Sequence, residues 1–144
     1  MIVRKAEMND APDLARLSLK LWPDHSFDEM VSEFTGFLAD EDTALFLAMD
    51  GIAVGFAQCQ LRRDYVEGTE SSPVGYLEGI FVEEPFRGRR YASELLAACE
   101  AWAKEKGCSE FASDCELGNE KSLAFHLSAG FSEANRIICF TKKL

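Results

Sequence analysis

The sequence lacks any apolar run close to the roughly 20 residues that a membrane-spanning helix requires. Its first ten residues, MIVRKAEMND, have no long apolar stretch after the basic residues, so they do not follow the pattern of a secretory signal. We therefore expect a cytoplasmic protein that has no membrane partner. With 144 residues, 47% of them hydrophobic, residues 1–144 have the size of a single domain with a substantial core.

Cysteine and histidine patterns that hold metals are also missing. The five cysteines are an odd number and no two have C-x-x-C spacing, which argues against a disulfide framework and against a structural zinc site. The two histidines, His25 and His126, are too isolated in the sequence to indicate a metal centre. We expect reduced cysteines, most of them in the core, and no metal.

Positive charge is scarce. Fifteen Lys and Arg residues against 25 Asp and Glu residues give a net charge of −10 at pH 7. Nucleic acid is not an expected partner, because phosphate binding requires a basic face. The acidic balance suits a cationic ligand drawn in by the field, although acidity that only keeps the protein soluble is the commoner explanation.

Hydrophobic periodicity and turn signals predict alternating strands and helices. Asp50-Gly51 between two apolar runs indicates a hairpin, and Ser26 and Glu29 have capping-box spacing. The predicted strands are residues 1–6, 43–49, 52–62, 74–82, 110–115 and 136–144, and the predicted helices are residues 9–22, 26–40, 88–106 and 119–130. Strands dominate early and β-α-β units come late, which predicts an α/β fold with a mixed sheet and helices on both faces.

The stretch YLEGIFVEEPFRGRRYASELL, residues 76–96, has two features that a plain core does not explain. Glu78 interrupts an apolar strand, and three arginines stand where that strand leads into a helix. Free N–H groups at a helix start, together with guanidinium groups, favour a phosphate or pyrophosphate. The alternative is a solvated basic turn that balances neighbouring carboxylates. Neither a P-loop nor a G-x-G-x-x-G motif is present.

The residues RGRRYA, 87–92, resemble the [Q/R]-x-x-G-x-[G/A] element with which GCN5-related N-acetyltransferases (GNAT) bind the pyrophosphate of acetyl-coenzyme A. Arg87 and Ala92 match its ends, whereas Arg90 stands where glycine is usual. NEKSLAFHLSAGF, residues 119–131, looks like a second segment of this family. Four stretches are similar to the bacterial aminoglycoside 6′-N-acetyltransferases: LWPDH (21–25), DYVEGTESSPVGYLEGIFV (64–82), FASD (111–114) and HLSAGF (126–131).

This resemblance, which covers nearly the whole chain, implies the GNAT fold: a mixed, mostly antiparallel sheet that is splayed between its fourth and fifth strands. It implies acetyl transfer from acetyl-CoA to the 6′-amine of a polycationic aminoglycoside by direct attack, so Cys115 is not expected to be a nucleophile. It also implies a homodimer. Two alternatives stay open: the same fold acting on a polyamine, metabolite or protein amine, and a non-catalytic acyl-CoA-binding module.

Three residues are implied to be catalytic. Glu78 is expected to accept the proton of the amine or to bind it as ammonium, with a solvent-facing carboxylate as the alternative. Asp114 is expected to be a second acidic substrate contact, although an aspartate at a strand end is also an ordinary turn residue. His126 occupies a position where many relatives have a tyrosine acid; an imidazole can protonate a thiolate, but a histidine at the rim of a short helix without such a role is the more ordinary interpretation.

The remaining implied contacts fall into two groups. Trp22, His25, Tyr65 and Glu70 are expected near the acceptor, where aromatic faces suit sugar rings; Trp22 and Tyr65 are alternatively core aromatics. A bulge at Ile80, Phe81 and Val82 is expected to present backbone N–H groups to the thioester and the pantetheine arm. The other coenzyme contacts are expected at Arg87, Gly88, Arg89, Arg90, Tyr91, Ala92, Ser93 and Asn119, of which Asn119 is alternatively only a helix cap.

Overall fold

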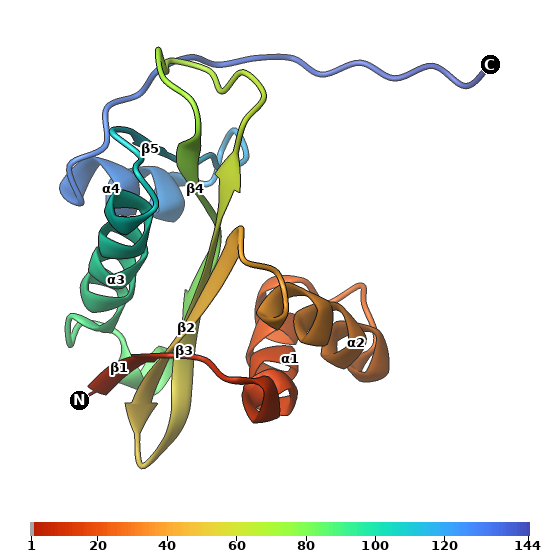
Figure 1. Cartoon of the computed structure of the whole chain (residues 1–144), viewed down its shortest axis with the longest axis vertical. Coiled ribbons are helices and arrows are strands. Elements are labelled where there is room, and N and C mark those ends of the chain that lie inside the picture. The colour runs from red at the N-terminus through yellow and green to blue at the C-terminus, as the bar shows by residue number, and fades with distance from the viewer. Residues whose placement is uncertain (1) are drawn as a thin grey trace.

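The computed structural model describes residues 2–144 and contains a five-stranded sheet between two layers of helices (Figure 1). The strands are β1 (Ile2–Lys5), β2 (Thr43–Asp50), β3 (Ile52–Arg62), β4 (Val74–Val82) and β5 (Phe111–Ala112). The helices are α1 (Ala11–Leu21), α2 (Phe27–Leu38), α3 (Tyr91–Glu105) and α4 (Glu120–Ser128), with 3₁₀ turns at Met8–Asp10 and Glu84–Phe86. Among the described residues, no helix has the length and hydropathy to span a membrane. Met1, the first residue of a predicted strand, lies outside this range.

The strands lie in the order β1-β2-β3-β4-β5, and every neighbouring pair is antiparallel except β4 and β5, which are parallel. The predicted hairpin between β2 and β3 turns at Gly51, whose φ of +76° suits a residue without a Cβ. β5 pairs with β4 only at Gly75 and Tyr76, so the two strands separate beyond Tyr76. The mixed, mostly antiparallel, splayed sheet predicted from the sequence is confirmed.

Each face of the sheet carries its own core. α3 covers one face, where Leu95, Cys99 and Trp102 pack against apolar side chains of β2, β3 and β4. α1 and α2 cover the other face, where Leu17 and Phe34 are fully buried against that side of the sheet. Figure 1 shows these two helices on one side of the strands and α3 and α4 on the other.

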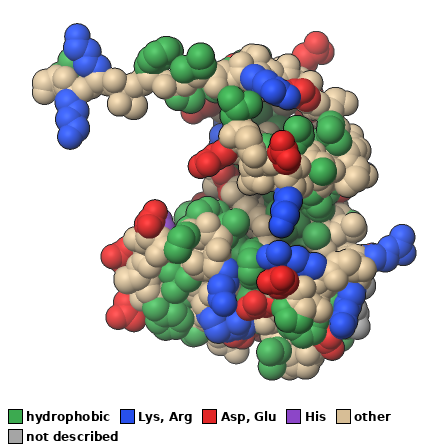
Figure 2. Space-filling model, turned by 180° about the vertical axis from the view of Figure 1, so that it is seen from behind, with side chains coloured by type: hydrophobic (Ala, Val, Ile, Leu, Met, Phe, Trp, Pro, Cys, Tyr) green, Lys and Arg blue, Asp and Glu red, His purple; other side chains and the backbone are tan. Residues whose placement is uncertain are grey.

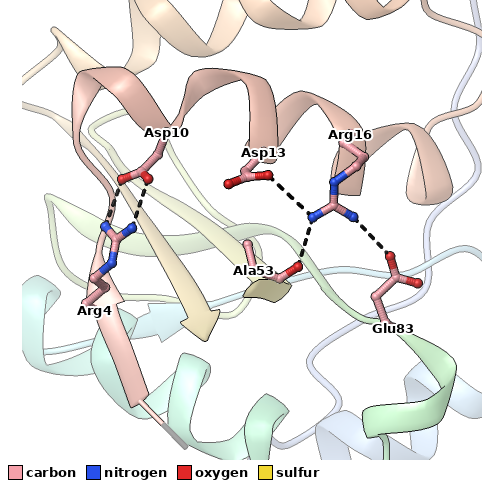
Figure 3. Close-up of polar contacts among 6 residues, drawn as sticks. All are labelled: Arg4, Asp10, Asp13, Arg16, Ala53 and Glu83. Atoms are coloured by element: carbon pink, nitrogen blue, oxygen red, sulfur yellow. Dashed lines mark hydrogen bonds and ion pairs between the residues drawn. The ribbon is translucent and has the colours of Figure 1, made fainter. Parts of the chain in front are cut away.

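Two arginines connect the first residues of the chain to the fold (Figure 3). Arg4 in β1 donates to both carboxylate oxygens of the buried Asp10, at 2.8 and 2.9 Å. This hydrogen bond holds the pKa of Asp10 below its ordinary value of 3.8, against the effect of burial. Arg16 in α1 donates to the Ala53 carbonyl at 2.8 Å and pairs with Glu83 at 3.4 Å, which fixes α1 against β3 and the end of β4.

Three predicted elements differ from the structure. The helix predicted from residue 88 begins at Tyr91, and the strand predicted at 110–115 is paired only at Phe111–Ala112. The strand predicted at 136–144 is wrong, because these residues have no strand partner among the described residues. β-Branched and aromatic residues favour an extended backbone, but a β-strand also requires a neighbouring strand with which its backbone can form hydrogen bonds. Figure 1 shows the C-terminal segment, residues 132–144, passing the β3–β4 loop and then running away from the fold.

Candidate active site

Glu78 is the extra residue of a β-bulge in β4. Gln58 of β3 pairs with Gly79 and the next residue, Cys59, pairs with Leu77, so Glu78 has no opposite residue in the register. A bulge reverses the alternation of side chains along its strand. As a result Leu77 faces the α3 core, while Glu78 and Gly79 both face α1 and α2.

The bulge implied at residues 80–82 is therefore wrong in position. Ile80, Phe81 and Val82 pair regularly with β3, and the irregularity lies at Glu78. The sequence contained a sign of this bulge. Leu77 and Ile80 are three positions apart and would face opposite sides of a regular strand, yet both are apolar, and in the structure both belong to the same core. Beyond Tyr76, the β5-facing edge of β4 has no strand partner in residues 2–144.

A cleft of about 310 Å³ opens beside Glu78. Its lining comes from the end of α1, from α2, and from β3 and β4: Trp22, His25, Met30, Glu33, Phe37, Gln58, Gln60 and Glu78. The structure thus brings together three of the predicted site residues, Trp22, His25 and Glu78. Figure 2 shows this face hollowed between the lobe of α1 and α2 and the end of the molecule from which the C-terminal segment leaves.

A second, slightly larger hollow of about 360 Å³ lies near Lys5, Asp40 and Lys106. Its lining contains none of the predicted site residues. We base the candidate site on the cleft at Glu78, because that cleft combines a carboxylate with aromatic and amide side chains and the other does not.

Glu78 is not isolated in its cleft. Nη2 of Arg62 donates to both carboxylate oxygens of Glu78, each at 2.8 Å. The guanidinium carbon of Arg62 lies 3.5 Å from the centroid of the Tyr76 ring, and the Tyr76 hydroxyl donates to Oδ2 of Asp114. Two predicted carboxylates, Glu78 and Asp114, are thereby joined by two residues that the sequence analysis did not identify.

The surroundings of Arg62 and Tyr76 set their protonation. Burial lowers the pKa of Arg62, but the hydrogen bond and the charge of Glu78 outweigh it and raise that pKa above its ordinary value. Burial, followed by the hydrogen bond to Asp114, raises the pKa of Tyr76. The Tyr76 hydroxyl therefore keeps its proton and remains a donor.

Asp114 lies in the exposed segment just after β5 rather than at the end of a longer strand. Tyr65 and Glu70 lie in the β3–β4 loop and do not line the cleft; Tyr65 is 76% exposed. The loop is fixed by Glu110, whose carboxylate accepts from the backbone N–H groups of Glu70 and Ser71, each at 2.9 Å.

His126 uses both ring nitrogens for contacts within its own region. Nδ1 lies 2.7 Å from the Ser122 carbonyl, and Nε2 lies 2.8 Å from the Ser113 hydroxyl. A carbonyl only accepts, so we assign the proton to Nδ1, and Nε2 then accepts from Ser113. The ring also packs against Phe125 and Phe131. These contacts hold His126 firmly and occupy the nitrogens that an acid would need.

The cationic turn has an unusual backbone. Arg90 precedes α3 with φ +70°, and it is the one non-glycine residue with positive φ among those the structure describes. Glycine adopts this left-handed conformation without strain, which is the physical reason that it suits this position. Arg87, Arg89 and Arg90 are exposed, and Nε of Arg87 donates to the Val82 carbonyl at 2.9 Å. Exposed cations next to the free N–H groups of the first turn of α3 are suited to a phosphate group.

Asn119 caps α4. Its side-chain oxygen accepts from the Ser122 backbone N–H at 3.2 Å. Tyr91 is buried at the start of α3, whereas Ser93 is exposed there and Ala92 is half-buried.

Sequence reasoning missed the cleft residues Glu33, Gln58 and Gln60. It also missed Arg62, which contacts Glu78, and Tyr76, which contacts Asp114. A signal existed for two of them, because Gln58 and Gln60 are alternating polar residues in an otherwise apolar strand. On an alternating strand such residues share a face.

Comparisons with known proteins show which proteins this chain is similar to. The profile of the family described as "Acetyltransferase (GNAT) family" matches residues 7–131. An aminoglycoside N(6′)-acetyltransferase type 1 from Stenotrophomonas maltophilia is 45% identical over 144 residues, which cover 99% of this chain and 93% of that protein. The protein of the same name from Salmonella typhimurium is 44% identical over 128 residues, 88% of each chain.

Two solved structures are similar over almost their full length. AAC(6′)-Iy in complex with the bisubstrate analogue CoA-S-monomethyl-acetylneamine superposes with a TM-score of 0.95 at 40% identity, covering 99% of this chain and 98% of that one. The aminoglycoside 6′-N-acetyltransferase AAC(6′)-Ig from Acinetobacter haemolyticus gives a TM-score of 0.94 at 37% identity, covering 100% and 99%.

Proposed function

The chain belongs to the acetyltransferase (GNAT) family, and we propose that it transfers an acetyl group from acetyl-CoA to the 6′-amine of aminoglycosides. Relatives that are 37–45% identical and aligned over most of the chain carry that activity in their names. The observation that carries the proposal is Glu78, a carboxylate placed by a bulge on a cleft between the sheet and the α1–α2 lobe. Acetylation of the antibiotic would confer resistance.

The cleft suits a polycationic saccharide. Glu33 and Glu78 supply negative charge, Gln58 and Gln60 supply amide hydrogen-bonding groups, and Trp22 supplies an aromatic face for a sugar ring. His25 stands at the same cleft. Tyr65 and Glu70, in the β3–β4 loop, would reach the acceptor only at its outer part.

The coenzyme would lie along the open side of the splay. Ile80 to Val82 belong to the part of β4 whose outer edge has no strand partner in the described residues, which leaves backbone groups for a pantetheine arm. The turn formed by residues 87–93 and the first turn of α3 would receive the pyrophosphate, and Asn119 stands at the start of α4. The positive φ of Arg90 fits this role, because it turns the backbone into the helix start as a glycine would.

The proposed chemistry is a direct transfer. The neutral amine attacks the thioester carbon, the C–N bond forms and the C–S bond breaks. The attacking nitrogen loses one proton, and the leaving thiolate takes up one, so that an amide and a thiol result. An alkylammonium with a pKa near 10.4 is only about one part in a few thousand neutral at pH 7, so the site must bind the ammonium and receive its proton. Glu78 serves the first need through its charge and the second directly or through water. Exposed Cys115 has no part in this sequence of steps.

We also propose a homodimer held together by the C-terminal segment. Ile137, Ile138 and Phe140 are 63%, 80% and 88% exposed, an apolar surface that water disfavours. The segment is basic, with Arg136, Lys142 and Lys143 against the single carboxylate Glu133, while the whole chain has a net charge of −10. A second copy offers both an acidic surface and a free sheet edge at β5, against which this segment would lie.

The proposed acceptor is tested with a matched pair of aminoglycosides, one with a 6′-amine and a close analogue with a 6′-hydroxyl, and with spermidine as a third acceptor. Thiol release from acetyl-CoA with the amine alone supports the proposal. Equal turnover of amine and hydroxyl compounds would place the acetyl group on another nitrogen. Turnover of spermidine alone would move the acceptor to polyamines, and coenzyme binding without turnover would leave an acyl-CoA-binding module. A cytoplasmic location and a single domain over residues 1–144 stay predictions.

A further inference from the structure

Arg62 is the last residue of β3, and it lies on the same face of the sheet as Glu78. Its side chain extends across the ring of Tyr76, with 3.5 Å from the guanidinium carbon to the ring centroid, and ends at the Glu78 carboxylate. One nitrogen, Nη2, contacts both carboxylate oxygens at 2.8 Å. The Tyr76 ring packs against one face of the guanidinium, and the Glu78 carboxylate holds its Nη2 end.

The chain of contacts continues on the other side. The Tyr76 hydroxyl donates to Asp114, so a continuous path Glu78–Arg62–Tyr76–Asp114 joins β4 to the segment after β5. We call this path the Arg62 bridge. It links β4 to the segment that follows β5, beside the point where the two strands separate after their last shared pair, Tyr76 and Ala112.

The charges around Arg62 explain why a cation belongs there. Glu33 and Glu78 line the cleft, Asp114 accepts a hydrogen bond from the hydroxyl of Tyr76, on whose ring Arg62 stacks, and the protein carries an excess of negative charge. The Glu78 side chain is 19% exposed and that of Arg62 is 38% exposed, so water screens this pair less than a surface pair. Arginine is suited to the task, because a planar guanidinium can stack on an aromatic ring and hydrogen-bond a carboxylate together.

We propose that Arg62 is a positioning residue of the acceptor site, which aims Glu78 and, through Tyr76, makes Glu78 and Asp114 act as one unit on a cationic acceptor. This role rests on the proposed function. Arg62 itself does not touch the reacting atoms. An acceptor with two or more ammonium groups gains most from it, since both carboxylates are held at a fixed separation.

The test compares three variants of neighbouring arginines. Arg62→Gln removes the charge and the stacked plane, and Arg62→Lys keeps only the charge. Arg63→Gln is the matched control, since Arg63 pairs with Asp42 at 2.6 Å in an exposed contact away from the cleft. We expect Arg62→Gln to raise the KM of a 6′-amino aminoglycoside about tenfold while the KM of acetyl-CoA changes less than about twofold. Arg63→Gln should leave both constants unchanged.

A double-mutant cycle measures the coupling between Arg62 and Tyr76. Tyr76→Phe keeps the ring and removes the hydroxyl that donates to Asp114. Its effect on the acceptor KM should be several-fold in the wild type and much smaller in the Arg62→Gln background, because contacting residues are not additive. The changes in the free energy of unfolding, measured for the same variants without substrate, should also be non-additive.

The outcomes separate this role from the proposed function. A wild type that turns over no aminoglycoside refutes the function and the role together. If the wild type is active, three results refute the role of Arg62 alone. The first is that the effects of Arg62→Gln and Tyr76→Phe on the acceptor KM are additive, and the second is that Arg62→Lys has the acceptor KM of the wild type. The third is that Arg62→Gln lowers the acceptor KM. The last result would show that Arg62 competes with the acceptor for Glu78.

Discussion

Trp22 lies so close to the backbone of Gly79 that a Cβ at residue 79 would stand 2.7 Å from Cη2 of the indole. The bulge turns residue 79 toward α1, and only glycine leaves room there for the ring. We predict that Gly79→Ala displaces Trp22, costs about 1–3 kcal/mol of stability and raises the acceptor KM. Chemical denaturation and steady-state kinetics measure both effects.

Gly36 provides the control for that change. It is an exposed residue of α2, and a Cβ there would meet nothing within 4 Å. Gly36→Ala should be neutral or stabilising by about 0.5–1 kcal/mol. An equal loss of stability in both variants would contradict the close contact between Trp22 and Gly79.

Glu78→Gln should lower kcat/KM by about 10²–10⁴-fold if the carboxylate receives the proton of the amine. The profile of log kcat/KM against pH distinguishes the roles: an unchanged slope near one, at a reduced height, counts against Glu78 as the sole base. Glu105→Gln is the control, because it makes the same change of charge at an exposed site at the end of α3, outside the cleft lining.

Arg90→Gly should give a more stable protein than Arg90→Ala, by about 1 kcal/mol. Both variants remove the guanidinium, but only glycine adopts the φ of +70° without steric strain. Unfolding free energies measured side by side decide the matter. Equal stabilities would indicate that residue 90 does not hold the left-handed conformation in solution.

The pairing of Arg4 with Asp10 predicts a pH dependence of stability. The pKa of Asp10 is lowered in the folded protein, so its contribution is present above the ordinary value of 3.8 and is lost as the pH falls through the lower, folded value. Asp10→Asn should therefore cost stability near pH 7, about 1 kcal/mol given that Arg4 is partly exposed, and progressively less in acid. Asp24→Asn, at an exposed position, should show no such trend.

Removal of residues 136–144 tests the proposed dimer. Sedimentation velocity should show a dimer for the complete chain and a monomer for the shortened one. Ile138→Asp should weaken association as well, because it places a charge in the apolar part of the segment. A monomeric complete chain, or a dimer that survives the truncation, would refute the proposed role of this segment.

Much of the fold followed from local signals in the sequence. Asp50-Gly51 identified the hairpin, and Ser26 identified the start of α2, where its side chain accepts from the Glu29 N–H. These features depend on residues only a few positions apart, so they can be recognised in the sequence itself.

The features that were missed depend on residues far apart in the sequence. The bulge at Glu78 is a relation between β3 and β4, and Arg62 meets Glu78 across 16 positions. Tyr76 reaches Asp114 across 38 positions. Residues 136–144 have the composition of a strand, but no strand pairs with them among the described residues, and local composition does not reveal this. Glu78 itself was identified because a carboxylate in an apolar run conflicts with its neighbours.

The bulge at Glu78 also sets stability and activity in opposition at one position. Without residue 78, Leu77 and Gly79 would be consecutive and would pair with the consecutive residues Cys59 and Gln58, giving a regular ladder with correct alternation on both faces. A single-codon deletion would therefore improve the sheet while removing the carboxylate from the cleft. The carboxylate at residue 78 therefore comes with an irregular ladder, which a chain selected only for robust folding would not need.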